Sequence, residues 1–176
     1  MSVKRLDAKL DQKKIAKQHA ANFTTADTVP FLSDLPLVGF RAETESDLGL
    51  FVAMRDGMIA MKTPIVLFVR SGVKVQADIG VTVVRDGDTH YSEMWRACDM
   101  VFCLSQEAVE EALDAMVVPL APKKMSHIQN YDPNREKGNA FVFEKLHPWL
   151  MFAAMVRACE TYRFPFDWKC IVRSRV

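Results

Sequence analysis

The densest group of side chains able to do chemistry lies between residues 86 and 93. Asp88 and His90 are two residues apart, so a β-strand would place both on one face, with Glu93 nearby. A carboxylate beside an imidazole can transfer protons or bind a divalent metal. The segment does not fit a calcium loop, because Tyr91 stands where that loop needs glycine. A solvated turn has the same composition, since Asp and Gly are common turn residues.

The four cysteines are the second candidate group. Cys98 and Cys103 could form half of a zinc site, completed by Cys159 and Cys170 or by His90. Apolar neighbours surround all four, and no Gly or Pro would help residues 98–103 to form a tight metal-binding turn. A catalytic thiol needs a neighbouring base, which the local sequence does not offer. We therefore expect reduced, mostly buried thiols, no tightly bound metal and no cofactor.

A long polar stretch, residues 121–139, has the composition of a binding loop and could close over a small anionic ligand. Its candidate ligand-binding residues are Lys123, Lys124, His127, Tyr131 and Arg135. A plain surface loop would have the same composition.

The N-terminal residues 1–22 are expected to form a basic helical arm on a single domain, residues 23–176. Six Lys or Arg and two Asp or Glu occur in residues 1–20. Four of the cations recur every four residues, so a helix places them on one face; they are Arg5, Lys9, Lys13 and Lys17. Such a stripe could follow nucleic-acid phosphates. No aromatic residues interleave for base stacking, however, and a solvated helix face has the same pattern.

Composition sets the broad class. The chain has 176 residues, of which 49% are hydrophobic and 26% charged, as expected of one globular domain. Glycine-rich phosphate loops, a nucleophile elbow and a His-Glu-x-x-His motif are absent from the sequence, which disfavours several large enzyme classes. The longest apolar run, residues 148–156, is shorter than a membrane span, and no secretion signal is recognised. These features predict a soluble, cytoplasmic protein with no membrane partner.

The middle of the chain has the pattern of an antiparallel sheet. Residues 65–69 form an apolar run typical of a buried strand. The tripeptide Arg-Asp-Gly occurs twice between strand-like runs, and Asp-Gly favours tight turns. Two hairpins are therefore predicted, which pair residues 50–54 with 58–62 and residues 81–84 with 89–94.

A helix over residues 47–61, capped by Ser46, is the alternative to the first hairpin. Gly49 and Gly57 argue against it, because glycine is a poor helix former.

The last third is predicted to contain helices from residue 106 to about 116 and from 148 to 162, with strands at 140–143 and 168–173. Ser105 is a favourable helix cap, and Pro148 suits the first position of a helix. Together, these elements predict an α+β fold: an antiparallel β-meander packed against one or two C-terminal helices, with a peripheral N-terminal helix.

The function ranked first is a non-catalytic interaction or small-ligand-binding domain that self-associates. The helix from Pro148 starts apolar all round, so we expect a homo-oligomer that covers Trp149, Phe152 and Met155. The alternatives are a small enzyme that uses Asp88, His90 and Glu93, and a nucleic-acid accessory protein that uses the basic arm.

Overall fold

The computed structural model describes residues 11, 13, 15–19, 35–76 and 79–174. The described strands form one six-stranded sheet, and every pairing in it is parallel. The strand order across the sheet is β3-β2-β1-β4-β5-β6. The strands are β1 Val38–Ala42, β2 Ile65–Val69, β3 Thr82–Arg85, β4 Met100–Phe102, β5 Val118–Pro122 and β6 Phe141–Phe143.

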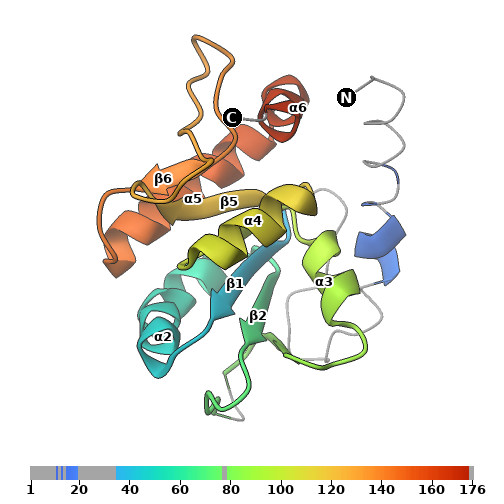
Figure 1. Cartoon of the computed structure of the whole chain (residues 1–176), viewed down its shortest axis with the longest axis vertical. Coiled ribbons are helices and arrows are strands. Elements are labelled where there is room, and N and C mark those ends of the chain that lie inside the picture. The colour runs from blue at the N-terminus through green and yellow to red at the C-terminus, as the bar shows by residue number, and fades with distance from the viewer. Residues whose placement is uncertain (1–10, 12, 14, 20–34, 77–78, 175–176) are drawn as a thin grey trace.

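Helices cover both faces of this sheet (Figure 1). One layer packs on the face that includes Phe40 and Leu67, and the other on the face that includes Phe68 and Val101. The first layer consists of α2 Glu45–Ala60, α5 Pro148–Tyr162 and α6 Pro165–Arg173. The second consists of α3 Tyr91–Ala97 and α4 Gln106–Asp114. The chain is therefore a three-layer, doubly wound α/β domain.

The antiparallel β-meander predicted from the sequence is wrong. A strand that is buried on both faces reads as a continuous apolar run, which is what a parallel sheet requires. All five residues of β2 are buried, and its bounds match the predicted strand at 65–69. The sequence pattern located the strand, but it did not reveal the direction of its partners.

The first predicted hairpin is a helix. Thr44 caps α2 through its side chain, which accepts a hydrogen bond from the Asp47 backbone, while the Asp47 carboxylate accepts one from the Thr44 backbone. This reciprocal capping box places the helix cap at Thr44, two residues before the cap considered at Ser46. Leu48, Phe51, Met54 and Met58 then recur on the face that the sheet buries.

The second predicted hairpin is a strand followed by a helix. Asp86 and Gly87 do form a turn, in which Gly87 has a φ of +91°. The turn leads into α3 instead of a return strand, so residues 89–94 do not pair with 81–84. The C-terminal strand predicted at 168–173 is likewise helical and belongs to α6.

Three other predicted elements are confirmed. The helix at 148–162 has the predicted bounds. Ser105 caps α4 by accepting a hydrogen bond from the Ala108 backbone. The strand near 140–143 is β6. The described N-terminal residues 11, 13 and 15–19 are helical, while the rest of the predicted arm lies outside the described residues.

Replacement of two glycines by alanine should change the stability of the fold in opposite directions. Gly39 lies in β1, and a Cβ there would stand 2.9 Å from Val101 Cγ2 and 3.1 Å from Phe68 Cε2. Gly49 lies in α2, and a Cβ there would meet nothing within 4 Å. We expect Gly39→Ala to lower the free energy of unfolding by about 1–3 kcal/mol through overpacking. Gly49→Ala should raise it by up to about 1 kcal/mol, because alanine is the better helix former.

Urea denaturation of both variants measures these changes. A destabilised Gly49→Ala protein would contradict the helix at residues 45–60.

Candidate functional site

The carboxyl ends of β1 and β4 mark the place where this topology can build a site. The two strands are neighbours, yet the chain leaves β1 toward α2 on one face and β4 toward α4 on the other. Neighbouring strands whose connections diverge in this way leave a crevice beyond their carboxyl ends, and open α/β sheets bind ligands there. The order β3-β2-β1-β4-β5-β6 has this switch point between β1 and β4.

Arg41 is the centre of a polar cluster at the switch point. Its residue is only 8% exposed, and its guanidinium meets carboxylates from three positions. Nε lies 3.1 Å from Glu43 Oε1, and the terminal nitrogens lie 2.5 Å from Glu111 Oε2 and 3.5 Å from Glu107 Oε1. The guanidinium carbon lies 5.8 Å from the ring centroid of Trp95. The guanidinium can be buried in its charged form because three carboxylates pair with it.

Glu43 joins the two diverging segments. The Ser105 hydroxyl, which follows β4, donates a hydrogen bond of 2.6 Å to Glu43 Oε1. Arg70, which follows β2, places a guanidinium nitrogen 3.6 Å from Glu43 Oε2. Residues from the segments that follow three adjacent strands therefore meet at one edge of the sheet.

The electrostatics of the cluster follow from burial and from the surplus of carboxylates. Burial lowers the pKa of Arg41, but the neighbouring Tyr91 and the carboxylates outweigh it, so the pKa is raised and the guanidinium stays charged. Burial also raises the pKa of Glu111, although Arg41 acts against this shift. Three carboxylates face two guanidinium groups, which leaves the cluster with excess negative charge.

This arrangement is poorly suited to a phosphate. The first turns of α2 and α4, whose amino ends flank the switch point, carry acidic residues: Glu45 and Asp47 in α2, and Glu107 in α4. Their carboxylates occupy the positive ends of the helix dipoles, where an anion would otherwise bind. Among the described residues, no group of three or more His, Cys, Asp or Glu is arranged to hold a metal ion.

The expectation of a non-catalytic binding module is corrected together with the α+β fold. A doubly wound sheet with a polar cluster at its switch point has the layout in which α/β proteins place their ligand and reaction sites.

The enzyme group predicted at residues 88–93 lies at the surface. Asp88 accepts a hydrogen bond from the Arg85 backbone and so closes its own turn. His90 Nδ1 lies 3.8 Å from Glu93 Oε2, and His19 Nδ1 lies 3.2 Å from Glu93 Oε1. The structure therefore brings Glu93 between two histidines and ties Asp88 to the backbone.

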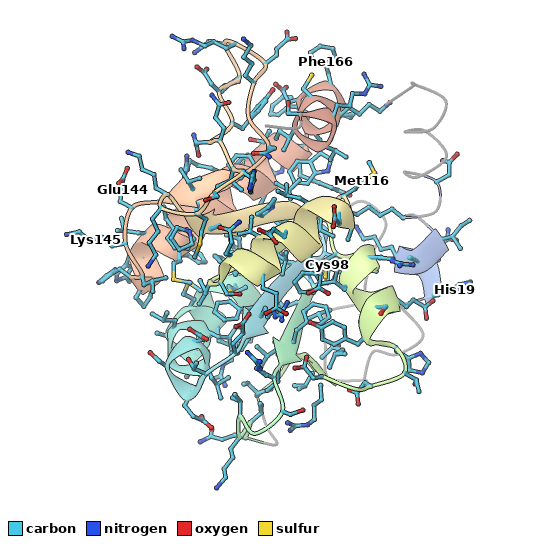
Figure 2. All side chains as sticks on the ribbon, in the orientation of Figure 1. His19, Cys98, Met116, Glu144, Lys145 and Phe166 are labelled. Atoms are coloured by element: carbon cyan, nitrogen blue, oxygen red, sulfur yellow. The ribbon has the colours of Figure 1, made fainter. Side chains whose placement is uncertain are left out.

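The cysteines lie on opposite faces of the sheet. Cys98 and Cys103 belong to the core between the sheet and the layer of α3 and α4, and Figure 2 shows Cys98 in the interior. Cys159 belongs to the core on the other face, and half-buried Cys170 packs against it. The predicted buried thiols are confirmed for Cys98, Cys103 and Cys159. The sheet separates the two pairs, so they cannot share one zinc ion.

The candidates in the polar stretch 121–139 do not converge. Lys123 pairs with Glu144, and Arg135 pairs with Asp132, both at the surface. Tyr131 is buried, and its hydroxyl donates a 2.6 Å hydrogen bond to Asp167. Lys124 is exposed. His127 lines a cavity at the amino end of β5. The stretch also begins inside β5, a strand that the sequence did not predict.

The described part of the basic stripe faces the protein. Lys17 is buried, and its Nζ lies 2.8 Å from the buried Asp99 carboxylate and also bonds the Leu35 carbonyl. Lys13 donates a 3.0 Å hydrogen bond to the Met116 carbonyl. Arg5 and Lys9 lie outside the described residues. Lys13 and Lys17 are thus used internally, which counts against a phosphate-binding role for them.

The predicted interface residues differ in exposure. Met155 is fully buried against the sheet. Phe152 packs on α2, where a Cβ on Gly57 would stand 3.1 Å from its ring. Trp149 is 73% exposed and is the member of the set that can reach a partner. Self-association stays a prediction, now centred on Trp149.

The buried Lys17–Asp99 pair predicts that the N-terminal helix contributes to stability. We expect Lys17→Met to lower the free energy of unfolding by about 3 kcal/mol or more, because it leaves Asp99 buried without its partner. The matched control is Lys123→Met, which removes a pair whose side chains are 66% and 67% exposed and should change stability by less than about 1 kcal/mol. Equal effects in chemical denaturation would contradict the docked helix.

Thiol alkylation tests the burial of the cysteines. Burial raises the pKa of Cys159 to about 12, and it raises the pKa of Cys98 and Cys103 as well. At mildly alkaline pH these groups remain protonated, and the thiolate is the reactive form. Iodoacetamide should therefore modify half-buried Cys170 first and the other three only after denaturation, as peptide mapping by mass spectrometry reports. Rapid labelling of native Cys98 would contradict this assignment.

No known protein family and no curated protein matches this sequence. Among solved structures, the chain is similar to the glycosyltransferase SnogD from Streptomyces nogalater, with 14% identity and a TM-score of 0.43 over 56% of this chain and 28% of that one. It is also similar to CalG4, the calicheamicin glycosyltransferase, with 15% identity and a TM-score of 0.47 over 85% of this chain and 41% of that one. The chain thus spans less than half the length of either structure. Within the described ranges, no helix is long and apolar enough to cross a membrane.

Proposed function

We propose that the chain is an enzyme domain that acts on a small, uncharged, hydroxyl-bearing molecule held over the carboxyl ends of β1 and β4. The observation that carries the proposal is the convergence of Glu43, Glu107 and Glu111 on the buried Arg41 at the switch point. This is the position at which open α/β sheets bind their ligands.

The charge of the cluster supports an uncharged substrate. The Glu107 side chain is 73% exposed, and its carboxylate would repel a phosphate or another anion. Carboxylates accept hydrogen bonds from hydroxyl groups, and the half-exposed guanidinium of Arg70 can donate them. A molecule with several hydroxyl groups matches both kinds of partner.

Glu111 is the group best placed to transfer a proton. Its side chain is 38% exposed, so one side can meet a substrate while Arg41 holds the other at 2.5 Å. Burial raises the pKa of Glu111, which lets it keep a proton closer to neutral pH than an ordinary glutamate does. Glu43 is less available, because Ser105, Arg41 and Arg70 already surround it.

Protein-observed NMR titrations test the proposal with methyl glucoside, glucose 6-phosphate and AMP as probes. We expect methyl glucoside to shift amide signals near residues 43, 70 and 105–107, and the two phosphates to bind more weakly because the acidic cluster repels them. Glu111→Gln should weaken binding roughly tenfold, since a hydrogen bond to a charged group contributes about 1.5–3 kcal/mol. Glu144→Gln, at the same edge of the sheet beyond β6, is the matched control and should change nothing.

Tighter binding of either phosphate, or an absence of shifts at these residues with methyl glucoside, would contradict the proposed substrate class.

A further inference from the structure

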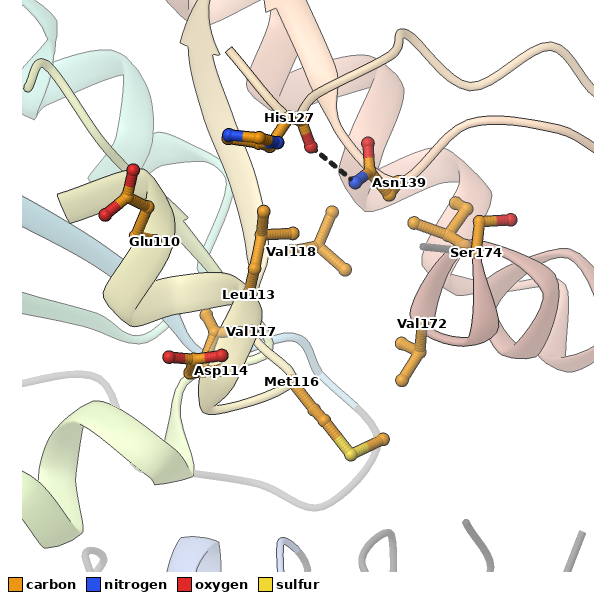
Figure 3. A pocket seen from close by; sticks show the side chains of 11 residues that line it. Glu110, Leu113, Asp114, Met116, Val117, Val118, His127, Asn139, Val172 and Ser174 are labelled. Carbon is orange, nitrogen blue, oxygen red and sulfur yellow. Dashed lines mark hydrogen bonds between the residues drawn. The ribbon is translucent and has the colours of Figure 1, made fainter. Parts of the chain in front are cut away.

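A cavity of about 300 Å³ lies at the far end of α4 from the switch point (Figure 3). It is bounded by the last turn of α4, the amino end of β5, the end of α6 and the segment that carries His127 and Asn139, and it is open to solvent on one side. Its volume is at the lower end of the range for small-ligand pockets. It lies at the opposite edge of the sheet from Arg41, so it is independent of the site proposed above.

The inner wall of the cavity is apolar. Leu113, Val117, Val118, Ile171 and Val172 line it. Asn139 is polar but already satisfied, because its side chain accepts a hydrogen bond from the Gln129 backbone and donates one to the His127 carbonyl. The apolar side chains offer surface to an apolar group, while Glu110, Asp114, His127 and Ser174 add polar groups to the rest of the lining.

The α4 side of the opening is negative. Glu110 and Asp114 lie one helical turn apart on this helix, and both line the cavity. Glu110 accepts a hydrogen bond from the Gln106 amide, and within the described ranges no ion pair is formed by either carboxylate. The last turn of α4 contains no basic residue, so its carbonyl ends add negative potential at the same place.

Lys13 is a described cation beside this cavity, because it donates a hydrogen bond to the carbonyl of the lining residue Met116. Its amine is engaged by this backbone carbonyl, and burial lowers its pKa. Among the described residues, Lys13 forms no ion pair with Glu110 or Asp114, since its amine bonds the Met116 carbonyl instead.

We propose that this cavity binds an organic cation: an amine attached to an apolar body of about the size of an indole ring. The apolar body fills the wall formed by β5 and α6, and the ammonium group faces Glu110, Asp114 and the carboxyl end of α4. An apolar cavity with a negative rim and a helix carboxyl end favours such a molecule over its neutral or anionic analogues.

Tryptamine is a suitable probe, and indole-3-propionate is its anionic counterpart of similar size. In NMR titrations of the full chain, tryptamine should shift signals at residues 110–118 and 171–174, and its affinity should fall as salt rises.

Glu110→Gln combined with Asp114→Asn should weaken tryptamine binding roughly fivefold or more, as expected for charge pairs at a partly exposed rim. Asp56→Asn, an exposed carboxylate in α2, is the matched control and should leave affinity unchanged.

A second variant tests the shape of the cavity. Val172→Phe enlarges a half-buried lining residue and should abolish tryptamine binding while the rest of the spectrum stays folded. Equal or tighter binding of indole-3-propionate would overturn the proposal, as would tryptamine shifts confined to residues outside the cavity. If Val172→Phe fails to fold, the double charge variant decides: unchanged tryptamine affinity in that variant overturns the proposal.

Discussion

The burial of a charged residue in the central strand constrains this structure more than any other single feature. β1 is covered on both faces and paired on both edges, so every one of its five residues is buried, including Arg41. An unpaired guanidinium at this depth would cost several kcal/mol, so carboxylates must reach it. Those carboxylates come from the residue after β1 and from α4, which fixes the start of α2 and the placement of α4 relative to the same strand.

The burial of Arg41 also determines the charge at the switch point. Glu107, one of the carboxylates that face Arg41, also lies in the first turn of α4, a place where many α/β proteins hold phosphate. The same residues therefore stabilise the fold and set the charge of the crevice. Stability and ligand preference cannot be changed independently here, because Glu111 takes part in both.

The direction of the strands could not be read from the sequence, because the signals that locate a strand do not specify its neighbours. Arg-Asp-Gly illustrates the difficulty: residues 55–57 continue a helix, whereas residues 85–87 end a strand and turn. Strands β1 and β5 were missed because Gly39, Arg41, Pro119 and Pro122 interrupt their apolar patterns. The backbone groups of Val118 and Leu120 form hydrogen bonds with β4, so the backbone nitrogen of Pro119 points toward β6. Pairing with β6 begins only at Leu120, and Pro119 is therefore tolerated because no hydrogen bond is required of it there.

The site was missed for a related reason. Sequence proximity singled out residues 88–93, but the switch-point cluster joins positions that are distant in the chain and become neighbours only in a parallel sheet. One local signal was present: a buried-type segment, Val38–Ala42, contains an arginine and is followed at once by Glu43. The burial of the cysteines could be predicted from the sequence, since a thiol among apolar neighbours is buried in a parallel and in an antiparallel sheet alike.

The parallel order of the strands also shapes how the chain acquires its structure during synthesis. Val38 of β1 lies opposite Ile65 of β2 on one side and Met100 of β4 on the other. As the chain leaves the ribosome, β1 can pair with β2 well before β4 exists, so one edge of the future central strand stays open. An open edge of this kind offers unpaired N–H and C=O groups to other chains, and long-range parallel pairing is slow. The vulnerable period in the life of this protein is therefore the interval before β4 emerges, when a nascent chain can aggregate although β1 is paired on both edges in the finished fold.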